Sequence, residues 1–358
     1  MNGDIYLEDE IRIGNLIKKI PQYQYYFAPI LETCMTDILN IPKSEIIKCP
    51  VMVKYVKTLY GGYSNESIIE RNLLKVTANF TSNTMKYVGD VSVEKYLLDI
   101  MKNDEILGVM RTFETYTHLL RGMINMQNLT SSIIHMDLKT NNIMMDEIHD
   151  VPIIIDFGFA VTNMELLNMV DYAKSLNYYY WSYQYDADES FIINWPIEVD
   201  LLCYISQIEF QLKNIKINDV IHTKDIANLH NAVDNYIEKT FMKYKYILSD
   251  ENISYFSLHT KLYLSAFEYM DWKVLIDDLL RTYNSWDNFG LALIYNYFIN
   301  HEATKYNSYC LDPFIQSCKK ELVNVIISPP GKRSQPKDTL NLLLDNWGKK
   351  LIKKDIIN

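Results

Sequence analysis

Two short polar segments on either side of an apolar run constrain this chain more than any other feature. The first segment, 135–142, reads His-Met-Asp-Leu-Lys-Thr-Asn-Asn, and the second, 156–158, reads Asp-Phe-Gly. Between them, 151–155 reads Val-Pro-Ile-Ile-Ile, which predicts a short buried strand that ends beside the second segment. The two segments supply three oxygen-bearing side chains, Asp137, Asn142 and Asp156, which could act together in one site.

Oxygen-bearing side chains at these spacings suit the transfer of a phosphoryl group. That reaction needs a hydroxyl nucleophile aimed at phosphorus and divalent metal to neutralise the phosphate oxygens, with little covalent help from the protein. Asp137 would accept the proton of the hydroxyl, while Asn142 and Asp156 would hold Mg²⁺, which prefers oxygen ligands. Lys139 would place a fixed positive charge beside the transferred group.

Either segment alone carries little information, because Asp-Phe-Gly is a common turn and His-x-Asp is usually a polar loop. Here they occur in a fixed order, with Asn142 five residues after Asp137 and Asp156 fourteen residues after Asn142. Together they resemble the catalytic and metal-binding loops of eukaryotic-type protein kinases. In amino-acid composition the chain is most similar to divergent serine/threonine kinases of large DNA viruses. It is rich in Asn, Ile, Lys and Tyr, as proteins encoded by AT-rich genomes of that kind are.

The resemblance implies an α+β, bilobal fold with a truncated small β lobe and a mainly helical large lobe that carries a helical insertion. It implies a serine/threonine protein kinase that uses ATP and Mg²⁺, with a protein hydroxyl as acceptor. Asp137 and Lys139 would be catalytic, and Lys139, Asn142 and Asp156 would bind the cofactors. Lys139 also favours serine or threonine over tyrosine as the acceptor.

Three neighbours of these residues are expected to shape the site without reacting. His135 would tie down the catalytic loop rather than carry a proton, and Phe157 would anchor the turn below Asp156. Gly158 permits backbone torsions that a residue with a Cβ resists.

The predicted layout is a small lobe at 1–84, a hinge at 85–90 and a large lobe at 91–358. Helical periodicity in 93–101 and again in 105–128 places two helices directly after the hinge. A rival position for the hinge is 55–62.

The small lobe shows one clear helix, at 8–20, which ends before Pro21. Glu10 is the best match to the glutamate of the kinase regulatory helix, with Glu8 as the alternative. Strands are expected at 25–31 and near 51–55.

The same lobe departs from the family, because no Gly-rich phosphate loop and no strand lysine are found upstream of Glu8. Lys18, Lys19 or Lys54 could replace that lysine only through a rearrangement. We therefore expect weak nucleotide affinity.

The segment 156–198 is rich in aromatic residues and resembles an activation segment that ends at Glu198, the counterpart of the glutamate in Ala-Pro-Glu. The resemblance implies that Glu198 pairs with a distant arginine, which Arg333 offers. It also implies a buried aspartate that holds the catalytic-loop backbone, and Asp287 is the best match. Asp287 comes 89 residues after Glu198, so we predict a helical insertion over about 199–284.

The amino-acid composition limits the kinds of partner and the cellular compartment that we expect. The net charge of −10 argues against nucleic acid, which is bound through clustered Lys and Arg. No apolar stretch is long enough to span a membrane, and five scattered cysteines without a Cys-x-x-Cys pair indicate reduced thiols. We expect an intracellular protein, in the host cytoplasm or the virion if the chain is viral.

Two alternatives remain open at this point. One is a pseudokinase or interaction module that binds a partner through its large lobe without transferring phosphate. The other is a small-molecule kinase, against which Lys139 and Asp287 argue. In addition, Met136 stands where many kinases have arginine, so control by a single phosphate on the activation segment is not expected.

Overall fold

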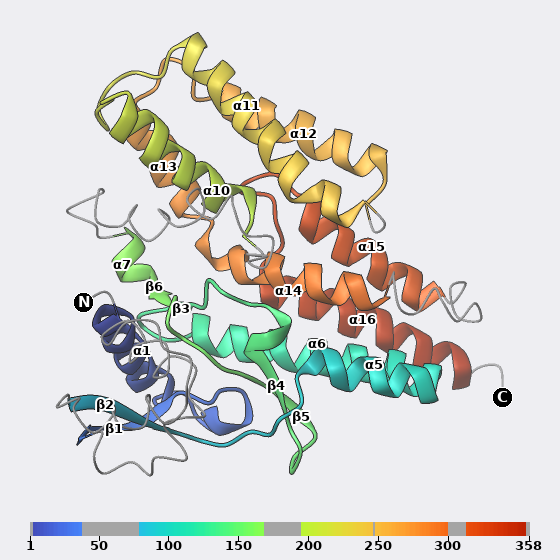
Figure 1. The fold of residues 1–358 in the computed structure, drawn as a ribbon. Helices are drawn as coiled ribbons and strands as arrows, with labels where there is room; N and C mark the ends of the chain where they lie inside the picture. The colour runs from blue at the N-terminus through green and yellow to red at the C-terminus, as the bar shows by residue number, and fades with distance from the viewer. Residues whose placement is uncertain (1–2, 38–78, 168–194, 246–247, 300–312, 356–358) are drawn as a thin grey trace, which may run out of the picture. The chain divides into compact units, whose positions relative to one another are not determined.

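The computed structural model describes residues 3–37, 79–167, 195–245, 248–299 and 313–355. These residues form a mixture of many helices and a few short strands, as an α+β fold requires. The chain divides into two compact units, one made of residues 30–87 and the other of residues 1–29 and 88–358. Figure 1 shows the elements of both.

The smaller unit contains an antiparallel ribbon. Strand β1 (Ile30–Asp37) pairs with β2 (Asn79–Met85), with Thr33 opposite Asn83 and an irregularity between Ile30 and Glu32. The segments 51–55 and 55–62, where a strand and a rival hinge were predicted, lie outside the described residues.

The strand predicted at 25–31 was wrong in most of its length, since β1 begins only at Ile30. A single turn of 3₁₀ helix, η1 (Tyr23–Tyr25), occupies its first residues. Gln22 precedes this turn with a left-handed backbone (φ 56°), which reverses the chain before a strand can start.

The N-terminal segment belongs to the larger unit because it is joined to the strand before Asp156. Helix α1 (Gly3–Ile17) begins five residues before the predicted helix and ends three residues earlier. After it, the Ala28 amide donates to the Ile154 carbonyl (3.1 Å), and the Ile154 amide donates to the Tyr26 carbonyl (2.9 Å). The predicted small lobe at 1–84 therefore differs from the compact unit at 30–87.

Two helices predicted after the hinge are confirmed as α5 (Val93–Asn103) and α6 (Glu105–Gln127). Ser92 caps α5 by accepting the Lys95 amide (3.3 Å), and Asp104 caps α6 by accepting the Leu107 amide (3.0 Å). Residues 86–90 form neither helix nor strand.

The two polar segments lie beside two small antiparallel sheets. Strand β3 (Ile133–Ile134) pairs with β6 (Val161–Thr162), and β4 (Ile143–Asp146) pairs with β5 (Val151–Ile154). Ile153 and Ile154 are fully buried, which confirms the predicted buried strand before Asp156. The 3₁₀ turn η3 (Thr140–Asn142) leads into β4.

The remaining described elements are helical, and the predicted insertion at about 199–284 is helical in its described parts. The helices are α7 (Asn163–Leu167), α10 (Ile197–Tyr204), the π-helix η5 (Ile205–Leu212), α11 (Thr223–Lys239), η6 (Phe241–Tyr244), α12 (Asp250–Ser265), α13 (Trp272–Leu280), η7 (Tyr283–Ser285), α14 (Trp286–Tyr297), α15 (Pro313–Ile327) and α16 (Pro336–Asp355). In Figure 1, α11 and α12 lie side by side, α10 packs against α11 and α13, and α14 packs against α6 and α15.

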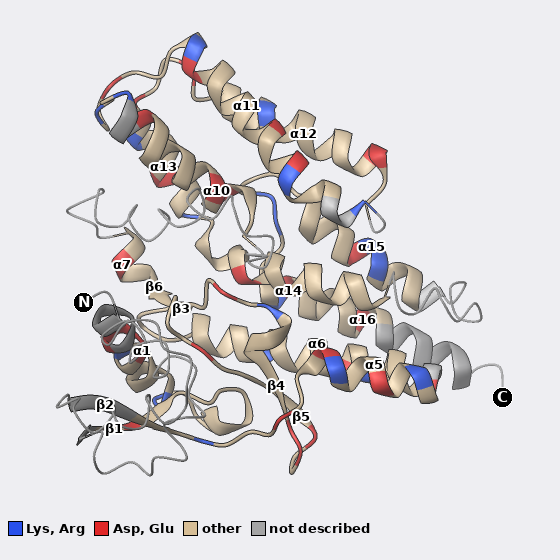
Figure 2. Cartoon of the chain, viewed as in Figure 1, with Lys and Arg blue, Asp and Glu red and all other residues tan. Residues whose placement is uncertain are grey.

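Basic and acidic residues are interspersed along several of the helices. Figure 2 shows Lys and Arg next to Asp and Glu along α5, α6 and α11. Within the described residues, no helix has the length and apolar character needed to cross a bilayer.

A buried ion pair connects α10 to the segment before α16. Arg333 Nη1 lies 2.7 Å from Glu198 Oε1, and both side chains are fully buried. Arg333 also donates to the carbonyls of Val325 (3.1 Å) and Ser328 (3.2 Å). The predicted contact between Glu198 and Arg333 is thus present, and the guanidinium satisfies two further carbonyls.

Removing one partner of this buried ion pair should lower the free energy of unfolding far more than removing one partner of an exposed ion pair. Arg333→Met leaves a buried, unpaired carboxylate and should lower the free energy of unfolding in urea by about 3–5 kcal/mol. The double variant Glu198→Leu/Arg333→Met should recover much of this loss, because an apolar pair needs no counter-charge.

Lys102→Met is the matched control, since Lys102 forms an exposed pair with Asp99 (3.5 Å). It should change the free energy of unfolding by about 0–1 kcal/mol. Equal losses for Arg333→Met and Lys102→Met would show that the buried pair does not stabilise the fold.

Candidate active site

The loop that carries Asp137 is held by a carboxylate from the first turn of α14. Asp287 Oδ2 accepts the amide of His135 (2.7 Å), and Asp287 Oδ1 accepts the amide of Met136 (3.0 Å). Burial raises the pKa of Asp287, while the nearby His135 and the two amides act in the opposite direction. This is the contact predicted for Asp287.

His135 is buried, and both of its ring nitrogens are engaged. Nε2 lies 3.0 Å from the Ile155 carbonyl, which can only accept, so Nε2 carries the hydrogen. Nδ1 then accepts the Asp137 amide (3.3 Å). A ring held in this way ties the loop to the end of β5, in agreement with the structural role predicted for it.

Met136 and Trp195 are two contributors that the sequence did not reveal. Met136 has a left-handed backbone (φ 66°), which is unusual for a residue with a long side chain. Its carbonyl accepts a hydrogen bond from the Trp195 indole, and the Trp195 carbonyl accepts one from the Tyr236 hydroxyl (2.9 Å). The fold thus holds a strained residue directly before Asp137, as is common at functional sites.

Asp137, Lys139 and Asn142 form one compact cluster. Lys139 Nζ lies 2.7 Å from Asp137 Oδ2, and Asn142 Nδ2 lies 2.9 Å from the same oxygen. Asn142 Nδ2 also donates to the Asp137 carbonyl (2.9 Å). Among the described residues, Asp137 Oδ1 makes no hydrogen bond, so this oxygen has acceptor capacity left.

Asn142 offers its amide oxygen in the same way. Both of its Nδ2 hydrogens are directed to Asp137, so the remaining polar atom of the side chain, Oδ1, is a pure acceptor. An amide oxygen is a ligand that Mg²⁺ accepts.

Backbone pairing places Asn142 next to Asp156. Ile143 lies opposite Ile154 in the β4–β5 pair, and just beyond it the Ile155 amide donates to the Asn142 carbonyl (3.0 Å). Asp156 follows directly, with an exposed side chain and a left-handed backbone (φ 63°). The two oxygen ligands predicted from the sequence therefore come from adjacent ends of paired strands.

Phe157 and Gly158 complete the turn around Asp156. The Phe157 ring is fully buried and packs against the His135 ring, with centroids 5.0 Å apart, and against Phe27, with centroids 6.1 Å apart. The Gly158 amide points to Asp156 Oδ1 at 3.4 Å.

Glu10 of α1 reaches this turn. Partial burial and the neighbouring Asp156 charge raise the pKa of Glu10, whereas a hydrogen bond from the Phe157 amide lowers it. Glu8, the alternative, is exposed. Of the lysines considered as partners, Lys18 directly follows α1 and its Nζ lies 3.4 Å from Asn15 Oδ1, and Lys54 lies outside the described residues.

The donor set suits a metal that shares its coordination with phosphate and water. Among the described residues, no group of three or more His, Cys, Asp and Glu side chains could hold an ion by itself. An ion at Asp156 and Asn142 would need further oxygen ligands from outside the protein, as Mg²⁺ has in nucleotide sites.

Comparison with known proteins adds no assignment: no protein-family model matches the chain, and no curated protein matches its sequence.

The role of Asp287 can be tested separately from any catalysis. Asp287→Ala leaves the amides of His135 and Met136 without an acceptor, at about 1–3 kcal/mol for each buried group. We expect the free energy of unfolding to fall by about 2–6 kcal/mol, and these two amides to exchange their hydrogens with solvent much faster.

Asp219→Ala is the matched control, because Asp219 also accepts a backbone amide, from Lys216 (2.8 Å), in an exposed turn. It should cost about 1 kcal/mol or less and leave exchange at 135 and 136 unchanged. Unaltered exchange in Asp287→Ala would contradict the role of Asp287 in holding this loop.

Proposed function

We propose that this chain is a Mg²⁺- and ATP-dependent serine/threonine protein kinase with a divergent kinase-like bilobal fold. The observation that carries the proposal is that the two carboxylate oxygens of Asp137 have different environments. Lys139 and Asn142 occupy one carboxylate oxygen and leave the other available, while the paired strands make Asn142 a backbone neighbour of the residue before Asp156.

In this proposal the acceptor hydroxyl binds at Asp137 Oδ1, the oxygen without a hydrogen bond among the described residues. As the hydroxyl oxygen attacks the γ-phosphorus of ATP, the bond from that phosphorus to the β,γ-bridging oxygen breaks and ADP leaves, while the hydroxyl proton passes to Asp137 Oδ1. Lys139 stays bound to Asp137 Oδ2 and supplies positive charge beside the transferred group. The hydrogen bonds to Oδ2 fix the carboxylate plane, so that Oδ1 is presented in one direction.

Asn142 and Asp156 would hold the metal in this scheme. Bound Mg²⁺ neutralises charge on the phosphate oxygens. The protein contributes the position of its two ligands, which the Ile155 to Asn142 backbone hydrogen bond fixes. Asp156 is exposed and therefore reachable by an ion that arrives with ATP.

Three further contacts support the kinase assignment, and the resemblance implies the first two of them. Asp287 holds the backbone of the catalytic loop, and Glu198 pairs with Arg333. Glu10, rather than Glu8, reaches the Asp-Phe-Gly turn. Contacts that join residues more than a hundred positions apart are not a consequence of local sequence patterns.

Removal of the proposed base should abolish transfer while preserving the fold. Asp137→Asn keeps the shape of the side chain but cannot take a proton, so transfer of the γ-phosphoryl of ATP to casein or myelin basic protein should slow about 10²–10⁴-fold. The matched control is Asp99→Asn on the exposed face of α5. Transfer that is equal in Asp137→Asn and the parent would refute the assignment of Asp137.

Binding of Mg-ATP can be measured apart from transfer. A ligand at a concentration of 100 Kd raises the free energy of unfolding by about 2.7 kcal/mol, so millimolar Mg-ATP should raise the melting temperature. Asp156→Asn should lose this increase and Asp137→Asn should keep it, because only Asp156 is a proposed metal ligand. Excess EDTA should also remove it.

These two assays separate the kinase from the interaction module considered above. Thermal stabilisation by Mg-ATP without transfer in the parent protein would favour a nucleotide-binding module. If Mg-ATP does not raise the melting temperature of the parent protein and no phosphoryl transfer is detected, the site is neither a kinase active site nor a nucleotide-binding site.

A further inference from the structure

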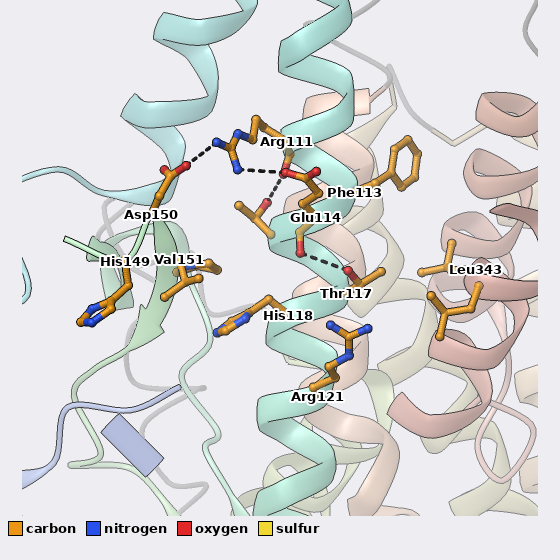
Figure 3. Close-up of a pocket in the computed structure, with 13 residues that line it drawn as sticks. Arg111, Phe113, Glu114, Thr117, His118, Arg121, His149, Asp150, Val151 and Leu343 are labelled. Carbon is orange, nitrogen blue, oxygen red and sulfur yellow. Dashed lines mark hydrogen bonds and ion pairs between the residues drawn. The ribbon is translucent and has the colours of Figure 1, made fainter. Parts of the chain in front are cut away.

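A second site lies on the larger unit, on one face of α6. A cavity of about 520 Å³ opens between α6, the turn from β4 to β5, and α16. This volume is in the range of small-molecule pockets. Figure 3 shows the side chains that line it, among them Arg111 and Arg121 of α6 and Leu343 of α16.

At one end of the cavity the charges neutralise one another. Arg111 Nη1 lies 2.9 Å from Glu114 Oε2, and Arg111 Nη2 contacts Asp150 Oδ2. Asp150 also accepts the Tyr96 hydroxyl (2.7 Å). Figure 3 shows Arg111 between the two carboxylates, so both acids of the lining already have donors.

Arg121 lies ten residues further along α6 and has a different environment. Its guanidinium lines the cavity, and it forms no hydrogen bond or ion pair with any described residue. Glu114 lies seven residues, or about 10 Å of helix, before Arg121, and both Glu114 and Asp150 are paired with Arg111. Arg121 thus places an uncompensated positive charge on the cavity wall.

His118, one turn before Arg121, does not add charge. Its Nε2 lies 2.7 Å from the Tyr25 carbonyl, and its ring stacks on Tyr26 with centroids 4.7 Å apart. Burial and the neighbouring Arg121 lower the pKa of His118, so the ring is neutral near pH 7. A carbonyl only accepts, hence Nε2 carries the hydrogen and Nδ1 is an acceptor.

The rest of the wall is apolar. Phe113 and Leu343 are almost fully buried behind the surface, and Pro152 and Val151 close the side formed by β5. Figure 3 shows Leu343 on α16 across from the α6 side chains. An apolar body can therefore be sheltered next to one positive charge.

We propose that this cavity binds a small amphipathic monoanion, with an aromatic or aliphatic body against the apolar wall and a carboxylate- or sulfonate-type group on Arg121. The site is separate from the proposed active site, because Val151 begins β5 whereas Asp156 lies two residues beyond its other end. The proposal is therefore independent of whether the chain transfers phosphate.

The test uses a pair of naphthalene probes that differ in charge. 8-Anilinonaphthalene-1-sulfonate carries one sulfonate, and N-phenyl-1-naphthylamine has a similar ring system without it; both fluoresce when sheltered from water. The folded parent protein should bind the sulfonate probe at one saturable site. Arg121→Gln should weaken that binding about tenfold, as expected for loss of one charge-assisted hydrogen bond, and Arg121→Lys should retain part of it.

Three controls make the result specific. Arg281→Gln removes an exposed arginine that does not line the cavity, and it should leave the affinity unchanged. The neutral probe should bind the parent and Arg121→Gln equally. Thr117→Trp places an indole in the cavity and should abolish binding of both probes, with melting curves used to verify that each variant is folded.

Several outcomes would overturn the proposal. Equal sulfonate affinity in the parent and Arg121→Gln would exclude Arg121 as the anion partner, and an equal loss in Arg281→Gln would indicate general surface charge. Displacement of the probe by saturating Mg-ATP, in a protein that Mg-ATP stabilises, would place the probe at Asp137 and Asp156 instead.

Discussion

The buried carboxylate of Asp287 is the constraint on which the candidate site depends. A carboxylate in an apolar interior is costly unless it is hydrogen-bonded, and here two consecutive amides supply the hydrogen bonds. Those amides belong to His135 and Met136, which directly precede Asp137. The cost of burying Asp287 is therefore offset only when this loop has one conformation, and that conformation sets the position of Asp137.

The second constraint is the pairing of β4 with β5. It makes Asn142 and Asp156 neighbours through the backbone, so their separation does not depend on flexible side chains. His135 joins the two constraints, because its ring bonds to the Ile155 carbonyl and its amide to Asp287. The proposed proton acceptor, Asp137, and the proposed metal ligands thus belong to segments that are held by one connected set of hydrogen bonds to the backbone.

Those parts of the molecule that have a recognisable sequence pattern could be predicted from the sequence. Apolar periodicity located α5 and α6, and the resemblance to kinases predicted the distant contacts of Asp287 and Glu198. Met136 and Trp195 were missed because a strained backbone and an indole hydrogen bond to a carbonyl have no local signature. The strand expected at 25–31 failed because the left-handed Gln22 introduces a turn that apolar residues do not indicate.

The turn that carries Asp156 also brings α1 to the candidate site. Partial burial and the Asp156 charge raise the pKa of Glu10, whereas a hydrogen bond from the Phe157 amide lowers it. The Phe157 ring is fully buried against the rings of His135 and Phe27. The residue that follows Asp156 therefore contacts both α1 and the loop before Asp137, so the position of Asp156 depends on both.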